Sequence, residues 1–297
     1  MWTMSPPWEE LLPSRVRRVN DRVVWDVRQI ATDPGMISFF ASSPDPESYP
    51  VEDFRLVLRQ IMREEGLDTL QYAPPAGHGP RKTHIAEKLR NANIPAQEEN
   101  LLILSGSIQG LDLVAELLLD PGDTVLVEEP TFYGALEIFD KYEATYVTLP
   151  MDGDGLRVDL LSEILNRQPA KPLFLMPNCH NPVGVDLSVA RRHQLIAISQ
   201  EYGLPLVTSD PYGDLRYQGR NLLSWLHWVE KRTPSCSAAI PRAWRLGYES
   251  GGCSVQPKSS RSGGWENSPR IALPIIWGNG RFSRWKGAGW SSDITRP

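Results

Sequence analysis

Between Glu99 and Tyr217, short apolar runs alternate with segments whose apolar residues recur at helical spacing. This alternation is typical of a chain that builds a mostly parallel sheet and packs helices on its faces. The runs are bounded by Gly, Pro, Asp or Asn, as short buried strands are. This part of the chain is therefore predicted to be α/β, with strands at Leu101–Leu104, Thr124–Glu128, Ala144–Leu149, Pro172–Met176 and Pro205–Thr208.

Four segments have the periodicity of helices. In the two that lie among the expected strands, large aliphatic side chains gather on one face, which we expect to pack on the sheet. Gly203 predicts where the last of the four ends. A loop rich in Gly and Pro, Tyr72–Pro80, joins the first two helices and is a candidate site. The expected helices are Glu52–Glu65, Arg81–Ala92, Gln109–Leu119 and Leu187–Tyr202.

Charge and composition exclude several classes of function. A net charge of −5 gives no basic surface for neutralising phosphates, so no nucleic-acid partner is expected. No stretch approaches an apolar membrane span, and Met1–Asn20 lacks the apolar run of a signal peptide. We therefore expect a cytoplasmic protein that binds no membrane. Absence of CxxC spacing and of paired histidines argues against a disulfide framework or a zinc site at the three cysteines, Cys179, Cys236 and Cys253.

The character of the chain changes after about Asn221. Seven of the ten tryptophans fall there, among runs rich in Ser, Gly and Arg that have neither strand nor helix period. Disordered tails are normally poor in aromatic residues, whereas folded domains show periodicity. This region fits neither description.

Five blocks within Ser14 to Arg220 carry a resemblance to a known family: Met36–Phe54, Leu70–Leu89, Leu102–Phe139, Pro177–Gly184 and Asp210–Tyr217. In this order they resemble the class I/II aminotransferases of fold type I, especially the branch that includes 2-aminoadipate and kynurenine aminotransferases. The resemblance implies pyridoxal phosphate as cofactor, amino transfer between an L-amino acid and a 2-oxo acid, and a homodimer. It also implies an N-terminal arm at 1–50, a partial cofactor-binding large domain at 51–220, and a tail at 221–297 in place of the small C-terminal domain.

A strand-to-helix turn at Ser105–Gln109 is a candidate phosphate site. Backbone N–H groups and a hydroxyl at a helix N-terminus attract anions, and Ser107 occupies the place of the phosphate-binding serine in the resembling family. The family usually has Gln where Ile108 stands, so only the backbone amide of Ile108 can serve. Taken alone, a serine at such a turn is usually a helix cap.

Four further residues match family positions that bind the cofactor. By resemblance, Phe132 stacks on the cofactor ring, although Tyr133 could be the packed aromatic instead. Asn181 matches the asparagine that donates to the phenolic oxygen, and Tyr212 matches the tyrosine that shares this oxygen. Tyr72 matches the tyrosine that reaches the phosphate of the neighbouring subunit, which implies the homodimer.

Two departures weaken the match. The family places aspartate, the partner of the pyridinium nitrogen, three residues before Tyr212, where this chain has Ser209. Asp210 cannot simply substitute, because successive strand residues point to opposite faces. A Gly-Gly pair that lets the backbone approach the substrate carboxylate is Ala41-Ser42 here, and the added Cβ atoms narrow that approach.

The lysine that forms the Schiff base with the cofactor is missing. The family carries it in a Ser-x-Ser-Lys motif followed by LAPGxRxGW, and neither Lys231 nor Lys258 has this context. However, synonymous codons for Ser237–Cys253, read two nucleotides out of register, encode GSYSKGLAPGIRIGWL. The hypothesis is a frameshift near Asn221–Leu223, after which the residues are not an evolved protein sequence and the chain does not turn over.

Two alternatives remain open. The same fold serves as the non-catalytic effector domain of bacterial transcription regulators, which carry a winged helix-turn-helix ahead of it. Met1–Gly35 is too short for such a domain, which disfavours this alternative. In the other, the chain is an active aminotransferase in which Lys231 attaches the cofactor.

Overall fold

The computed structural model describes residues 11–13, 35, 37, 47, 49–72, 74–75, 77–91, 96–213, 235–238 and 252–255. Its contacts divide the chain into two units, Met1–Tyr72 and Ala73–Pro297. Within the described ranges, no helix is both long enough and apolar enough to cross a membrane.

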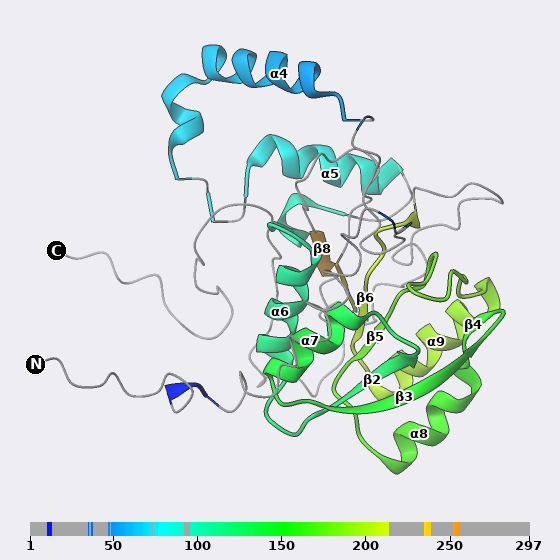
Figure 1. The fold of residues 1–297 in the computed structure, drawn as a ribbon. Helices are drawn as coiled ribbons and strands as arrows, with labels where there is room; N and C mark the ends of the chain where they lie inside the picture. The colour runs from blue at the N-terminus through cyan, green and yellow to red at the C-terminus, as the bar shows by residue number, and fades with distance from the viewer. Residues whose placement is uncertain are drawn as a thin grey trace, which may run out of the picture. The chain divides into compact units, whose positions relative to one another are not determined.

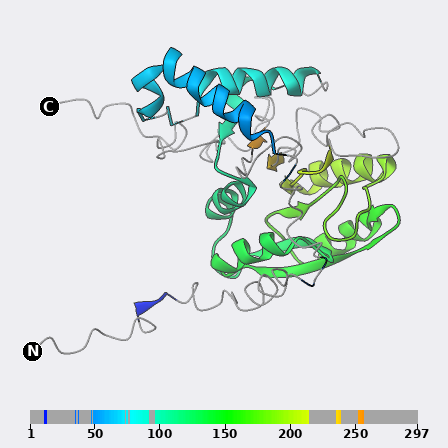
Figure 2. The same ribbon diagram turned by 45° about the horizontal axis from the view of Figure 1, so that its top comes forward.

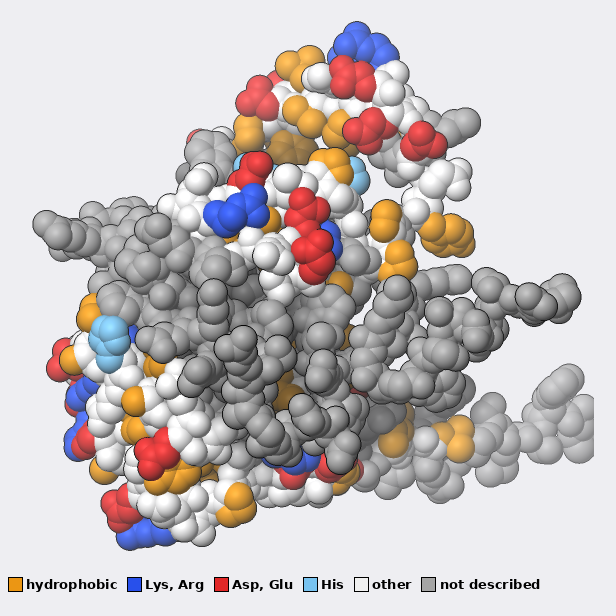
Figure 3. Space-filling view, turned by 180° about the vertical axis from the view of Figure 1, so that it is seen from behind, with side chains coloured by type: hydrophobic (Ala, Val, Ile, Leu, Met, Phe, Trp, Pro, Cys, Tyr) orange, Lys and Arg blue, Asp and Glu red, His pale blue; other side chains and the backbone are white. Residues whose placement is uncertain are grey.

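The first unit contains the helix α4, Val51–Glu64, and a short 3-10 helix, η3, Gly66–Leu70. The helix expected over Glu52–Glu65 is thus confirmed. Glu52 and Asp53 lie in its first turn and Arg63 in its last, where their charges complement the helix dipole. No residue of α4 is buried, and Figure 3 shows apolar side chains open to view among acidic and basic ones.

The second unit is built on one sheet with a parallel centre (Figure 1). Strands β7, β6, β5, β2 and β3 run parallel to their neighbours in that order, whereas β8 pairs antiparallel with both β7 and β1, and β4 pairs antiparallel with β3. In sheet order the strands are β1 (Leu101–Ile103), β8 (Gly252–Val255), β7 (Ser235–Ala238), β6 (Leu206–Thr208), β5 (Leu173–Leu175), β2 (Thr124–Glu129), β3 (Thr145–Asp152) and β4 (Gly155–Leu156).

All five strands expected from the apolar runs are present, and none of their ends differs from the expected one by more than three residues. Strands β7 and β8 were not expected, because they lie after Asn221 in the region without strand period. Their backbones nevertheless complete the sheet between β6 and β1. Backbone pairing needs only N–H and C=O groups, which every residue except proline offers.

Helices cover both faces of the sheet, as predicted (Figure 2). Helices α6 and α7 pack on one face, and α8 and α9 pack on the other. Gly203 ends α9 in the left-handed conformation with φ of 66°, which confirms the expected stop. The helices of this unit are α5 (Gly79–Asn91), α6 (Ser107–Leu118), α7 (Tyr133–Lys141), α8 (Leu161–Arg167) and α9 (Val189–Tyr202), with 3-10 turns η4 (Glu98–Asn100) and η5 (Val158–Leu160).

Alternation along β2, β5 and β6 directs their side chains into two cores, one on each face of the sheet. Val127, Phe174 and Val207 point into the first core, which α6 and α7 cover. Their neighbours Leu126 and Leu206 point into the second core, which α8 and α9 cover. Because side chains alternate between faces along a strand, the parity of a residue, odd or even in number, shows which core it faces within one strand such as β6.

Candidate active site

The parallel strands bring four chain segments to one edge of the sheet. In open α/β sheets ligands bind beyond the carboxyl ends of the strands, and β2, β5 and β6 are neighbours with their carboxyl ends together. Phe132 follows β2, Asn181 follows β5 and Tyr212 follows β6. The turn before α6, which contains Gly106, follows β1. These segments form the candidate site.

The first turn of α6 presents backbone N–H groups. The helix begins at Ser107, and its N-cap is Gly106, which has no side chain to cap the turn. The side-chain oxygen of Gln109 accepts the N–H of Ser105 at 2.8 Å, which holds the turn closed ahead of the helix. Since the N–H groups of a first turn have no acceptor within the helix, this turn can bind an anion. The hydroxyl of half-buried Ser107 lies within the turn and is not the helix cap.

Phe132 presents the aromatic ring at this edge. It is half-buried against the first core, whereas Tyr133 is 42% exposed. A Cβ atom built on Gly134 would lie 2.7 Å from Phe132 Cζ and 3.1 Å from Ile108 Cδ1. The ring therefore lies close to Gly134, beside the first turn of α6, and a side chain at position 134 would displace it.

Asn181 and Tyr212 meet across the ends of β5 and β6. The Nδ2 group of Asn181 donates a long hydrogen bond of 3.4 Å to the hydroxyl of Tyr212. Both residues are half-buried. An amide donor and a phenol that lie this close can share one acceptor oxygen of a ligand.

A buried pair supports the turn that carries Asn181. His180 Nε2 lies 3.0 Å from Glu128 Oε2, and the two side chains are 0% and 1% exposed. The same carboxylate oxygen accepts the N–H of Met176 at 2.8 Å. Burial raises the pKa of Glu128, while the contact with His180 opposes this shift. In the sequence, Glu128 stands out as an acidic residue inside an apolar run, but nothing there indicates that His180 is its partner.

A second network ties Asp210 to α9. The buried guanidinium of Arg192 donates through Nη2 to Asn178 Oδ1 at 2.6 Å, and Asn178 Nδ2 donates to Asp210 Oδ2 at 2.7 Å. The other oxygen of Asp210 accepts the N–H of Gly213 at 3.0 Å. Both oxygens of the Asp210 carboxylate therefore accept hydrogen bonds that hold the loop between β6 and Tyr212.

Ser209 is buried at the end of β6. It is 3% exposed, and its N–H donates to the carbonyl of Leu175 at 3.0 Å, which extends the β5–β6 pairing by one residue. Ser209 has the parity of Val207, which faces the first core. Phe132 and Tyr212 pack against that same core. A neutral hydroxyl thus stands where the resembling family places an aspartate.

Five expected residues are not placed relative to this site. Ala41, Ser42, Lys231 and Lys258 lie outside the described residues. Tyr72 belongs to the first unit, where its side chain is 85% exposed.

The described residues contain no disulfide at Cys179 and no metal-binding cluster. Only the backbone is described for Cys236 and Cys253. Among the described residues no cluster of His, Cys, Asp or Glu could hold a metal ion.

The residues present fit most of a phosphorylated pyridine cofactor. The open first turn of α6 fits its phosphate, Phe132 fits its flat ring, and the Asn181–Tyr212 pair fits its phenolic oxygen. Ser209 brings no charge for the ring nitrogen. The lysines described in this unit lie on α5, at the end of α7 or just ahead of β5: Lys82, Lys88, Lys141 and Lys171.

A parallel-centred sheet with helices on both faces and these groups at its carboxyl edge defines the large domain of a fold type I enzyme. The chain belongs to the aminotransferase class I and II family, whose model matches residues 43–254. Pyridoxal phosphate is the cofactor of this family. The family and the fold class that the sequence resemblance implied are thereby confirmed.

Three relatives illustrate the match. A 2-aminoadipate transaminase of Thermus thermophilus is 32% identical over 71% of this chain and 52% of its own length. The structure of a Pyrococcus horikoshii kynurenine aminotransferase, solved in complex with PMP, superposes with a TM-score of 0.77 at 29% identity over 84% of this chain and 63% of that one. YisV, an uncharacterised HTH-type transcriptional regulator of Bacillus subtilis, is 25% identical over 98% of this chain and 59% of its own length. The chain thus spans about half to three-fifths of these curated relatives.

Proposed function

We propose that this protein binds pyridoxal phosphate at the carboxyl edge of its sheet and derives from an enzyme that moves an amino group between an L-amino acid and a 2-oxo acid. The convergence of the α6 turn, Phe132, Asn181 and Tyr212 at that edge carries the proposal. When bound, the cofactor carries the amino group and withdraws electrons from the α-carbon of the substrate.

Each group has one binding task. The first-turn N–H groups of α6 and the hydroxyl of Ser107 bind the phosphate, and Phe132 stacks on the ring. Asn181 and Tyr212 donate to the phenolic oxygen. Glu128 and His180 touch none of these ligand atoms, but they hold the turn on which Asn181 stands. Together these groups orient the ring without any group that could attach it.

We also propose that the chain is inactive because a frameshift near Asn221–Leu223 removed the attaching lysine. The out-of-register Ser-x-Ser-Lys motif over Ser237–Cys253 supports this. A frameshift changes the encoded residues but not the spacing of the codons. The positions at which the parent fold has strands are therefore preserved along the chain. Strands β7, Ser235–Ala238, and β8, Gly252–Val255, overlap the two ends of this segment, which agrees with that spacing.

The nucleotide sequence tests the frameshift directly. A continuous offset frame that encodes the motif beyond Asn221 is expected. A stop codon or a different peptide in that frame rules the shift out.

Borohydride reduction tests whether any lysine of the full chain attaches the cofactor. Purified protein is incubated with pyridoxal phosphate, reduced and weighed by mass spectrometry, while binding is followed by fluorescence. Reversible binding without a covalent adduct is expected. An adduct that Lys231→Ala abolishes and Lys258→Ala leaves intact supports the alternative in which Lys231 attaches the cofactor. Absence of any binding contradicts the proposed function.

A regulator-like protein is the second candidate, favoured by the alignment with YisV over 98% of this chain. Such a protein would bind the cofactor and sense an amino acid without producing a 2-oxo acid. Thermal unfolding with cofactor, with and without a panel of L-amino acids, distinguishes the two candidates when combined with an assay for 2-oxo acid release. Ligand-dependent stabilisation in a frame-corrected protein that releases no 2-oxo acid favours the regulator.

The homodimer and the cytoplasmic location are also parts of the proposal. Exposure of Tyr72, at 85%, agrees with a side chain that reaches a neighbouring subunit. Light scattering of the full chain is expected to give twice the mass of 33.4 kDa. A monomer at concentrations well above those used for cofactor binding contradicts the dimer.

A further inference from the structure

Ser209 directly follows β6, at the position where the family places the charged partner of the ring nitrogen. It is buried, it extends the pairing between β5 and β6, and its parity directs it to the core against which Phe132 and Tyr212 pack. A ring stacked at Phe132 with its phenolic oxygen at the Asn181–Tyr212 pair therefore has Ser209 along its edge.

The chemistry of a pyridine ring depends on the charge at this edge. A carboxylate within about 4–6 Å stabilises the protonated nitrogen and raises its pKa by roughly 1–3 units. A serine hydroxyl is neutral, and it can donate a hydrogen bond to the lone pair of an unprotonated nitrogen. Burial in addition disfavours the charged form of the ring.

Two other acidic groups at this edge, Asp210 and Glu128, already have hydrogen-bond or ion-pair partners. Asp210 is held by Asn178 and by the N–H of Gly213. Glu128 is held by His180 and by the N–H of Met176, and it has the parity of Leu126, which faces the second core. The basic group of the same edge, Arg192, donates to Asn178 and to the carbonyl of Pro177.

We propose that Ser209 binds the cofactor with its ring nitrogen unprotonated, which makes this a site that holds the cofactor and its amine form but withdraws electrons weakly from a bound substrate. The inference rests on the proposed function, since it concerns the same site. The inference distinguishes two changes in this chain, the loss of the lysine and the loss of the charge at position 209. Correcting the reading frame would restore the lysine but not the charge.

The test uses the full chain and pyridoxamine phosphate labelled with ¹⁵N in the ring, a form of the cofactor that needs no lysine. The ¹⁵N chemical shift is measured at pH 7 and followed toward lower pH in the native protein, in Ser209→Asp and in Ser209→Asn. Asparagine matches aspartate in shape and adds no charge, so it separates charge from fit. Native protein and Ser209→Asn are expected to show the unprotonated shift, and Ser209→Asp to show a ring pKa higher by about 1–3 units.

Each outcome has one meaning. A protonated ring in the native protein at pH 7 overturns the role of Ser209 while leaving cofactor binding in place. Equal shifts in Ser209→Asp and Ser209→Asn also overturn it. If the native protein binds no labelled cofactor, the proposed function itself fails, and the inference fails with it. The native measurement stands even where Ser209→Asp does not fold.

Discussion

The imidazole of His180 lies 3.0 Å from the carboxylate of Glu128, and neither side chain is more than 1% exposed. This contact joins the end of β2 to the turn that carries Asn181, two segments that are far apart along the chain. Because His180 immediately precedes Asn181, the pair fixes where the amide donor of the site stands.

His180→Ala is expected to destabilise the fold by about 3–5 kcal/mol, because it removes the side-chain partner of the buried carboxyl group of Glu128. Urea unfolding measures the change. His84→Ala, the same substitution at an exposed position on α5, is the control and should change the stability by about 0.5 kcal/mol or less. Equal effects of the two substitutions would show that the buried pair contributes nothing.

Asn181→Ala is expected to weaken the binding of pyridoxamine phosphate by about 2- to 10-fold. This range corresponds to the loss of one hydrogen bond of about 0.5–1.5 kcal/mol. Fluorescence titration of the full chain gives the affinity. Asn166→Ala removes an amide from α8, where it accepts from Tyr202, and should leave the affinity unchanged. Unchanged affinity in Asn181→Ala would remove this residue from the site.

The sequence predicted the parts of the fold that depend on local pattern. Period and boundary residues were enough for β2, β3, β5, β6 and α9, because burial of one face imposes the period. The family blocks indicated Phe132, Asn181 and Tyr212, and the sheet brings these residues to one edge.

The parts that the sequence did not predict depend on partners distant in the chain. Nothing near Glu128 marks His180 as its partner, and nothing near Asp210 marks Asn178, since parallel pairing alone brings them together. Strands β7 and β8 carry no side-chain period, so no local pattern could predict them.

Gly155→Ala is expected to destabilise the protein by about 2 kcal/mol or more. Gly155 has φ of +87°, and an added Cβ would lie 2.9 Å from the backbone Cα of Leu187. A backbone clash adds to the cost of a left-handed residue, about 1–2 kcal/mol. Gly153→Ala is the matched control, since its Cβ would meet nothing within 4 Å. Similar melting temperatures for the two variants would contradict the prediction.

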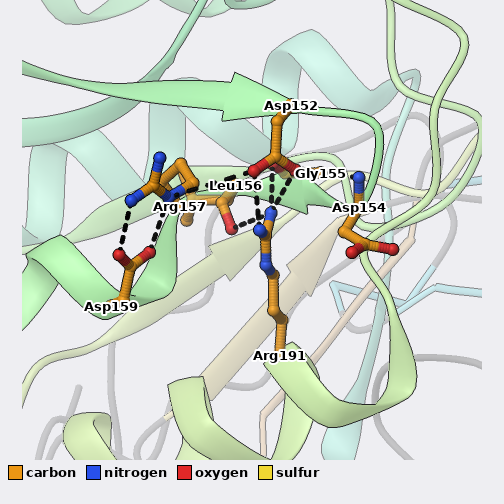
Figure 4. Close-up of polar contacts among 7 residues, drawn as sticks. All are labelled: Asp152, Asp154, Gly155, Leu156, Arg157, Asp159 and Arg191. Carbon is orange, nitrogen blue, oxygen red and sulfur yellow. Dashed lines mark hydrogen bonds and ion pairs between the residues drawn. The ribbon is translucent and has the colours of Figure 1, made fainter.

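The pair of Asp152 with Arg191 at the β3–β4 hairpin makes part of the stability depend on pH (Figure 4). Hydrogen bonds from Arg191 at 2.6 and 2.7 Å, together with the N–H of Asp154, lower the pKa of Asp152 to about 2. Because the folded-state pKa lies below the unfolded value of about 3.9, the stabilisation is present above that value and is lost as the pH falls toward 2.

Thermal unfolding between pH 5 and about 2 tests this linkage. Asp152→Asn is expected to reduce the fall in melting temperature over this range, because the variant has no carboxyl to titrate there. Asp154 is two residues from Asp152 and is also exposed, so Asp154→Asn should leave the pH dependence of the native protein unchanged. Identical pH profiles for native protein and Asp152→Asn would show that the pair does not contribute.

Restoring the reading frame is expected to return the attaching lysine but only weak amino transfer. The ring partner at position 209 lies before the proposed shift, so the frame-corrected protein still has a neutral hydroxyl there. Adding Ser209→Asp should raise kcat by about a hundredfold or more, the order of effect that one preorganised electrostatic group has on a transition state. Ser209→Asn in the same background keeps the shape without the charge and should give no such gain. Full activity in the frame-corrected protein without any change at Ser209 would show that the missing charge is supplied by another group, and that the proposed inactivity of this chain has a single cause.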